Sequence, residues 1–135
     1  MAGQLTISTL SDGTNSTSST NCIQGSAKAW VNFVGSNGSV TKSYNVGSIT
    51  RTGTGLYTVN FTNSLADANY AIFSSSTQQG VSGTSYSGTV LPGSQGGTIT
   101  KTTSACNVAY NQVLNNGSGY TNTTDPAQVW VVIFD

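Results

Sequence analysis

Apolar and polar residues alternate in short runs over most of the chain, and turn-forming residues separate the runs. In residues 27–34 every second position is apolar, and these positions are Ala27, Ala29, Val31 and Phe33. A period of two places such residues on one face of a β-strand. The same pattern predicts further strands at residues 40–46, 49–51, 56–61, 70–73, 86–91, 98–101 and 106–113.

The run at residues 128–134 is apolar at odd and even positions alike. A continuous apolar run of this length predicts a central strand that is covered on both sides. Turn signals lie at residues 35–38 and 52–55 and at Pro92-Gly93, and the segment 63–69 is the only place where a helical turn is expected. The pattern predicts an all-β fold: a single β-sandwich of about eight or nine strands with jelly-roll or Greek-key connections and no substantial helix.

One expected strand, residues 40–46, has a mixed face. Its alternation places Val40, Lys42, Tyr44 and Val46 on the same side.

The first 26 residues differ from the rest of the chain. Only residues 4–10 alternate, and residues 11–20 form a Ser/Thr/Asn tract that contains Asp12-Gly13. This composition predicts an exposed loop or arm. We therefore divide the chain into an extended N-terminal arm with one short strand, residues 1–26, and a β-sandwich domain, residues 27–135. The arm is either a docking segment or a frayed terminus.

Composition limits the possible partners. Only 6% of the 135 residues are charged, four basic residues balance four acidic ones, and there is no histidine. Duplex nucleic acid is bound by clusters of Lys and Arg, which are not present here, so nucleic-acid binding is not expected. No stretch approaches the ~20 apolar residues that span a bilayer, so membrane insertion is not expected either.

No common type of active site can be assembled from these residues, so we expect a protein that is not an enzyme and has no cofactor or metal. The absence of histidine removes most nucleophile–base pairs and the commonest metal ligand. The four aspartates are far apart and mostly lie beside Gly, Pro or Asn, where Asp favours turns. The two cysteines, Cys22 and Cys106, form either a disulfide or two reduced thiols, because the sequence cannot place their Cα atoms within ~6 Å of each other.

Aromatic residues are the remaining candidates for binding. Trp30 shares its strand face with Lys28 and Asn32, opposite the expected core face. Tryptophan is enriched at subunit interfaces, so these three residues are a candidate subunit interface. Tyr86, Tyr110 and Tyr120 fall in or near expected loops and form a candidate recognition surface.

The first half of the chain contains Ala-Lys-Ala-Trp-Val-Asn-Phe at 27–33, followed by the segments 43–46, 48–50, 53–61 and 66–70. Together these residues resemble a β-domain that recurs in structural proteins of tailed phages, especially at the ends of tail fibres. The close of the chain, Asp125-Pro126-Ala127 followed by residues 129–134, also resembles the terminal strand of that domain. The match is weaker at residues 78–122, where such domains vary and where recognition loops are expected.

The resemblance implies a virion structural protein that assembles as a homotrimer and has no catalytic residues. In such fibre proteins the domain ends a much longer chain, whereas here only about 26 residues precede it, enough for an arm but not for a shaft. One expectation is therefore a capsid decoration or cement protein, or a short head fibre, on the exterior of the particle, with the major capsid protein as its partner. The other is a tail-fibre or tail-tip adhesin whose loops bind host surface polysaccharide and whose partners are tail proteins.

Overall fold

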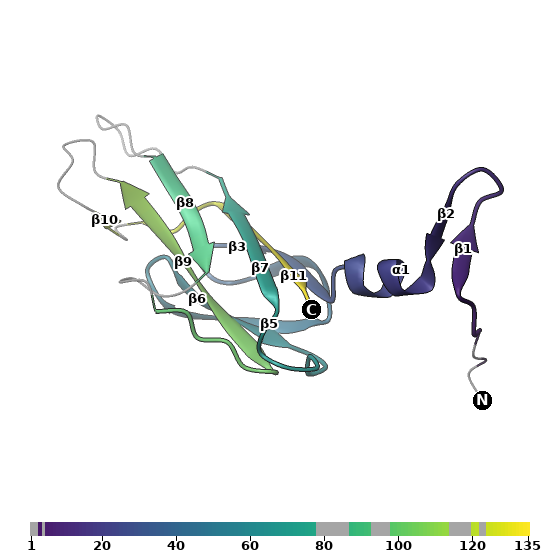
Figure 1. Cartoon of the computed structure of the whole chain (residues 1–135). Helices are drawn as coiled ribbons and strands as arrows, with labels where there is room; N and C mark the ends of the chain where they lie inside the picture. The colour runs from purple at the N-terminus through teal and green to yellow at the C-terminus, as the bar shows by residue number, and fades with distance from the viewer. Residues whose placement is uncertain (1–2, 4, 78–86, 93–97, 114–119, 122–123) are drawn as a thin grey trace.

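The chain forms two antiparallel β-sheets that share one core, with an N-terminal arm that projects from one end (Figure 1). The structure is a computed structural model, and it describes residues 3, 5–77, 87–92, 98–113, 120–121 and 124–135. The all-β prediction is confirmed, since a single short helix accompanies the strands in these ranges.

The first sheet has the strand order β4-β3-β11-β7, with bounds Val40–Tyr44, Ala29–Val34, Gln128–Phe134 and Ala71–Ser76. The second sheet has the order β10-β9-β6-β5, with bounds Tyr120–Thr121, Ala105–Val113, Leu56–Phe61 and Val46–Gly53. Strand β8 (Ser87–Pro92) also pairs with β9. The final apolar run therefore lies in the centre of its sheet, as expected.

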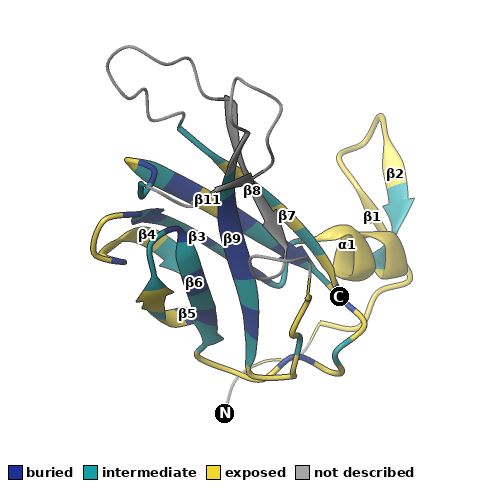
Figure 2. Cartoon of the chain, turned by 90° about the vertical axis from the view of Figure 1, so that its left-hand side faces the viewer, coloured by how far each residue is buried: buried dark blue, intermediate teal, exposed yellow. Residues whose placement is uncertain are grey.

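The core lies between the two sheets (Figure 2). Alternate residues of the central strands are buried: Ala29, Val31 and Phe33 on β3, Tyr57 and Val59 on β6, Cys106, Val108 and Tyr110 on β9, and Val129, Val131 and Ile133 on β11. The rings of Phe33 and Tyr57 meet edge to face across the core, with centroids 5.0 Å apart. The period of two read from the sequence thus identifies the core faces of these strands.

The chain passes from the first sheet to the second at Asn45, which has a φ of 53°. Asparagine tolerates this left-handed conformation better than most residues. Its side chain holds the corner in place, because Nδ2 donates to the Lys28 and Asn63 carbonyl oxygens and Oδ1 accepts from the Asn63 amide. The expected common face for residues 40–46 is wrong at both ends. A register shift in β4 pairs Val40 with the core residue Phe33, whereas Lys42 pairs with Asn32. Beyond the corner Val46 is buried in the other sheet, whereas Tyr44 is exposed.

The arm is more ordered than the sequence predicts. Strands β1 (Thr9–Ser11) and β2 (Ser16–Ser18) form a small hairpin, and helix α1 (Ser19–Gly25) follows directly. The Asp12 carboxylate accepts hydrogen bonds from the amides of Thr14 and Asn15 in the hairpin turn. The expected loop at 11–20 is therefore a hairpin and the start of a helix.

The helical turn expected at residues 63–69 is not found, because that segment is irregular. It crosses from β6 to β7 between the two sheets and buries Leu65.

Candidate binding surfaces

The outer face of the first sheet carries aromatic side chains from all four strands. The strand register places Tyr44 beside Trp30, Trp30 beside Val132, and Val132 beside Phe73, so the four residues form one row. Neighbouring strands are about 4.8 Å apart, so this row spans roughly 14 Å. A second row runs through Lys42, Asn32, Trp130 and Ser75. We call the apolar members of this surface the aromatic face: Trp30, Tyr44, Phe73, Trp130, Val132 and Phe134.

The aromatic face is open in this structure. Tyr44 is 58% exposed, Phe73 62% and Trp130 39%, and the other members are half-buried. Phe73 and Phe134 pack edge to face with centroids 5.9 Å apart, so the rings support one another. Strand β11 was expected to be covered on both sides, and this is wrong for its outer side, where Trp130 is exposed and Val132 and Phe134 are only half-buried.

The three residues of the predicted subunit interface have different places. Trp30 and Asn32 lie on the outer side of β3, within the two rows. Lys28 precedes β3, and its Nζ donates to the Ile23 carbonyl oxygen and to Ser26 Oγ at the end of α1. Lys28 therefore positions the arm.

The outer face of the second sheet is of a different kind. We call the set Ser48, Thr50, Thr58, Asn60 and Asn107 the polar face, because these side chains alternate with core residues on β5, β6 and β9. Asn60 Nδ2 donates to Ser48 Oγ over 3.2 Å and to Thr50 Oγ1 over 3.0 Å. These uncharged groups form hydrogen bonds with one another, and water satisfies the exposed ones that remain.

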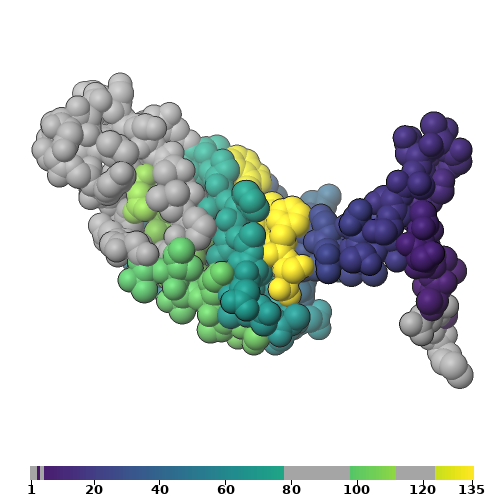
Figure 3. Space-filling view, in the orientation of Figure 1, coloured from purple at the N-terminus to yellow at the C-terminus, as the bar shows by residue number. Residues whose placement is uncertain are grey.

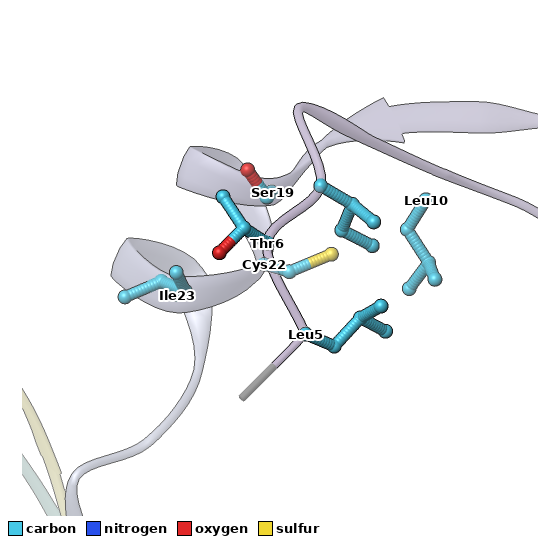
Figure 4. Close-up of a pocket in the computed structure, with 7 residues that line it drawn as sticks. Leu5, Thr6, Leu10, Ser19, Cys22 and Ile23 are labelled. Carbon is cyan, nitrogen blue, oxygen red and sulfur yellow. The ribbon is translucent and has the colours of Figure 1, made fainter. Parts of the chain in front are cut away.

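The arm presents a second apolar surface. Leu5, Ile7, Leu10 and Ile23 are exposed, and none of the residues of α1 is buried. Leu5, Leu10, Cys22 and Ile23 are among the residues that line a hollow of about 380 Å³. In Figure 4 the Cys22 sulfur points between Leu5 and Leu10. We call Leu5, Ile7, Leu10, Cys22 and Ile23 the arm patch. The space-filling view shows the arm standing away from the domain as a separate lobe (Figure 3).

The two cysteines are free thiols, so the disulfide interpretation is wrong and the alternative of two reduced thiols describes this structure. They cannot meet because they belong to different parts of the molecule: Cys22 is exposed on the arm, whereas Cys106 is buried in the core on β9. Burial raises the pKa of Cys106 to about 12, so its thiol remains protonated and unreactive at neutral pH.

Asp125 ties the turn between β5 and β6 to the segment before β11. Its carboxylate accepts hydrogen bonds from Arg51 Nη2 at 2.8 Å, from the Gly55 amide at 2.7 Å and from Tyr57 Oη at 2.9 Å. Burial acts to raise the pKa of Asp125, but the hydrogen bonds from Arg51, Gly55 and Tyr57 together outweigh it and hold the pKa below its usual range. Burial and the Asp125 carboxylate raise the pKa of Tyr57, so the phenol stays protonated and donates.

The other carboxylates also hold the backbone. Besides Asp12 in the arm hairpin, Asp67 accepts from the Asn69 amide and Asp135 from the Ala66 amide. In the described ranges no three His, Cys, Asp or Glu residues gather into a set that could hold a metal ion. The arrangement of these acidic groups is thus that of turn and loop supports.

The predicted recognition tyrosines do not form one surface. Tyr110 is fully buried on the inner side of β9, so its assignment to a recognition surface is wrong. Every second residue of β9, namely Cys106, Val108 and Tyr110, faces the core, and this spacing was already visible in the sequence. Tyr86 lies outside the described residues, and for Tyr120 only the backbone pairing with Val113 is described.

Sequence reasoning missed Tyr44, Phe73 and Trp130 as members of the site. The sequence did contain one signal, the alternation of side chains between the two faces of a strand. Trp130 lies between Val129 and Val131, which face the core, so it must point to the outer side. The strand pairing that aligns these side chains with Trp30 could not be read from the sequence.

Comparisons with known protein families, with curated proteins and with solved structures found no match to this chain. Among the residues that the structure describes, no helix has the length and apolar character needed to cross a membrane. The function must therefore be argued from the surfaces themselves.

Proposed function

We propose that this chain is a non-enzymatic structural protein on the exterior of a tailed-phage virion, a homotrimeric capsid decoration or cement protein or a short head fibre. Its partners are further copies of itself and the major capsid protein. The observation that carries the proposal is the open aromatic face, because large aromatic residues gathered on one exposed surface mark an interface with another macromolecule.

The size of the face supports an assembly role. An aromatic side chain buries about 200 Å² when it is fully covered. The exposed fractions of Tyr44, Phe73 and Trp130 therefore leave roughly 300 Å² of aromatic surface open, before the half-buried members are included. The largest apolar patch on a typical monomer is ~300–600 Å² and is often functional.

The use of the charged residues supports a role without catalysis. All four carboxylates accept hydrogen bonds from the protein's own backbone or side chains. Arg51 pairs with Asp125, and the amines of Lys28 and Lys101 donate to backbone carbonyl oxygens. General acid–base work requires a titratable group placed to meet a substrate. These groups are instead placed to hold turns and loops.

The virion part of the proposal rests on the resemblance at residues 27–70 and on the low charge of the surface. A chain with only 6% charged residues binds its partners by apolar contact and hydrogen bonding, and such binding depends little on salt. A protein that reinforces a capsid gains from contacts of this kind, because they persist when the ionic strength outside the host changes.

Immunoelectron microscopy of intact virions tests the location. We expect an antibody against this protein to label the whole head, with hundreds of copies per particle. Label confined to the tail would refute the decoration role and favour an adhesin that binds host surface polysaccharide. No label on the particle would refute both virion roles.

Sedimentation analysis of the purified chain tests the homotrimer. We expect a trimer that Trp30→Ala weakens, because loss of an aromatic anchor in an interface typically costs about 2 kcal/mol. A wild-type chain that remains a monomer at all accessible concentrations would contradict the oligomer.

A further inference from the structure

Strand β11 has the composition of a strand covered on both sides, but the part of its own chain that the structure describes buries only one side. Val129, Val131 and Ile133 face the core and are fully buried. Trp130, Val132 and Phe134 occupy the opposite side in the middle of the first sheet. The polar face shows that this chain uses Ser, Thr and Asn where a sheet meets water. The aromatic face is therefore built for a cover that comes from outside its own chain.

The arm patch offers such a cover. Leu5 is 81% exposed and Ile23 64%, and with Ile7 and Leu10 they line one apolar hollow. The patch cannot reach the aromatic face of its own chain while α1 is held as described, because the contacts from Lys28 to Ile23 and Ser26 direct the helix away from the domain (Figure 1). One chain thus presents two open apolar surfaces that are kept apart.

We propose that the arm patch of one copy packs on the aromatic face of a neighbouring copy. This inference rests on the homo-oligomer of the proposed function, and not on its place on the virion. The contact joins two different surfaces, so it is heterologous and closes into a ring when the rotation between copies permits. A trimer closes it with three equal contacts.

The area limits how copies can associate. A stable interface buries about 800 Å² per partner. The ~300 Å² of open aromatic surface is too small to supply this through a single contact. In a closed ring each copy makes two contacts, one through its aromatic face and one through its arm patch, so the area buried per copy is the sum of both surfaces.

Charge is also complementary. Asp12 is the only charged residue of the arm's first 26 positions. Lys42 is exposed on β4, in the same row as Trp130. An arm that crosses the aromatic face of a neighbour brings an acidic group toward a basic one, and this favours the encounter and its register.

Cross-linking tests the proposal, because Cys22 already lies in the arm patch. Ser75→Cys places a thiol on the aromatic side of β7, next to Trp130, without removing an aromatic residue. Ser48→Cys is the matched control, an exposed serine on the polar face of the other sheet. Each full-length variant is treated with a short bis-maleimide, and the products are separated by denaturing electrophoresis.

We expect Ser75→Cys to give covalent dimers and trimers, and Ser48→Cys and the wild type to remain monomeric. These covalent dimers and trimers should disappear when Cys22→Ser is added to the Ser75→Cys variant. Cross-linked products that persist without Cys22 would overturn the proposal, because they would indicate face-to-face packing. A monomer with the linker joining its own two thiols would also overturn it, since the arm would then cover its own domain. An oligomer in sedimentation with no cross-link from Ser75→Cys would overturn the arm exchange and leave the homotrimer standing.

Association measurements give a second test. We expect Leu10→Ser in the arm patch and Phe73→Ser in the aromatic face each to weaken association about thirtyfold, as for an interface anchor worth about 2 kcal/mol at 1.4 kcal/mol per factor of ten. Ile99→Ser is the matched control, because Ile99 is 54% exposed and lies in neither surface. Circular dichroism checks that each variant folds. Equal weakening by Ile99→Ser, or none by Leu10→Ser, would overturn the proposal.

Discussion

Asp125 offers the sharpest test of how this fold is held together. Asp125→Ala removes the acceptor for the buried Gly55 amide and for the hydroxyl of Tyr57, which is 1% exposed. A buried donor that loses its partner costs about 1–3 kcal/mol. Two such donors therefore predict a loss of about 2–6 kcal/mol in the free energy of unfolding.

The ion pair with Arg51 adds little to this. The Arg51 side chain is 33% exposed, so solvent screens its attraction to Asp125, and exposed pairs contribute about 0–1 kcal/mol. Arg51→Met should cost no more than about 1 kcal/mol, because the carboxylate keeps its bonds to Gly55 and Tyr57. Asp125→Asn should fall between the two variants, since the amide retains one acceptor oxygen.

Urea unfolding followed by tryptophan fluorescence measures these differences. Every variant must be compared at one protein concentration and in the same oligomeric state, because association adds to the apparent stability. The reasoning is refuted if Arg51→Met costs as much as Asp125→Ala, since the ion pair and not the buried donors would then dominate.

The pH dependence provides an independent check on Asp125. Its pKa is lowered in the folded state, so its contribution to stability is complete above the pKa of a free aspartate, about 3.9, and is lost as the pH falls through the lower folded value. The stability difference between wild type and Asp125→Asn should therefore be constant between about pH 7 and pH 5 and shrink below about pH 4. A difference that grows on acidification would contradict the assigned direction.

Three further predictions concern single residues. Asn45→Ala should destabilise the domain more than Asn45→Gly by about 1 kcal/mol in urea unfolding, because both lose the side-chain hydrogen bonds but only alanine is strained at a φ of 53°. Gly35→Ala should cost about 1–3 kcal/mol, since a Cβ there would overlap the carbonyl oxygen of Pro126, and an unchanged urea midpoint would contradict this close approach. At pH 8 a thiol reagent should modify Cys22 at once and Cys106 only as fast as the protein unfolds, and mass spectrometry of the timed products distinguishes the two sites.

Much of the fold could be predicted because the central strands bury alternate residues. In β3 the alternation of Ala29, Val31 and Phe33 with polar or larger residues gives the strand, its length and its core face. The same is true of β6, where Tyr57 and Val59 point inward. These are local signals that the period of two carries directly.

The features that could not be predicted depend on partners distant in sequence. The chain passes from one sheet to the other at Asn45, and this corner depends on hydrogen bonds to Lys28 and Asn63. No local sequence pattern predicts these bonds. Helix α1 follows a polar tract whose residues are weak helix formers, and it begins where the Ser18 hydroxyl accepts from the Asn21 amide. For this reason the sequence pattern predicted a helical turn only at residues 63–69 and not at α1.

The candidate surfaces also show what the sequence pattern could and could not predict. The prediction that β11 is covered on both sides is wrong for its outer side, because the described residues of the chain bury only the side that faces the core. Hydrophobic patterning is set by the environment that a strand has in its working state, which includes the partner molecules. We therefore propose that the disagreement between pattern and burial at Trp130 marks the side that a neighbouring copy covers, whereas the agreement at Val129 and Val131 reports only the core.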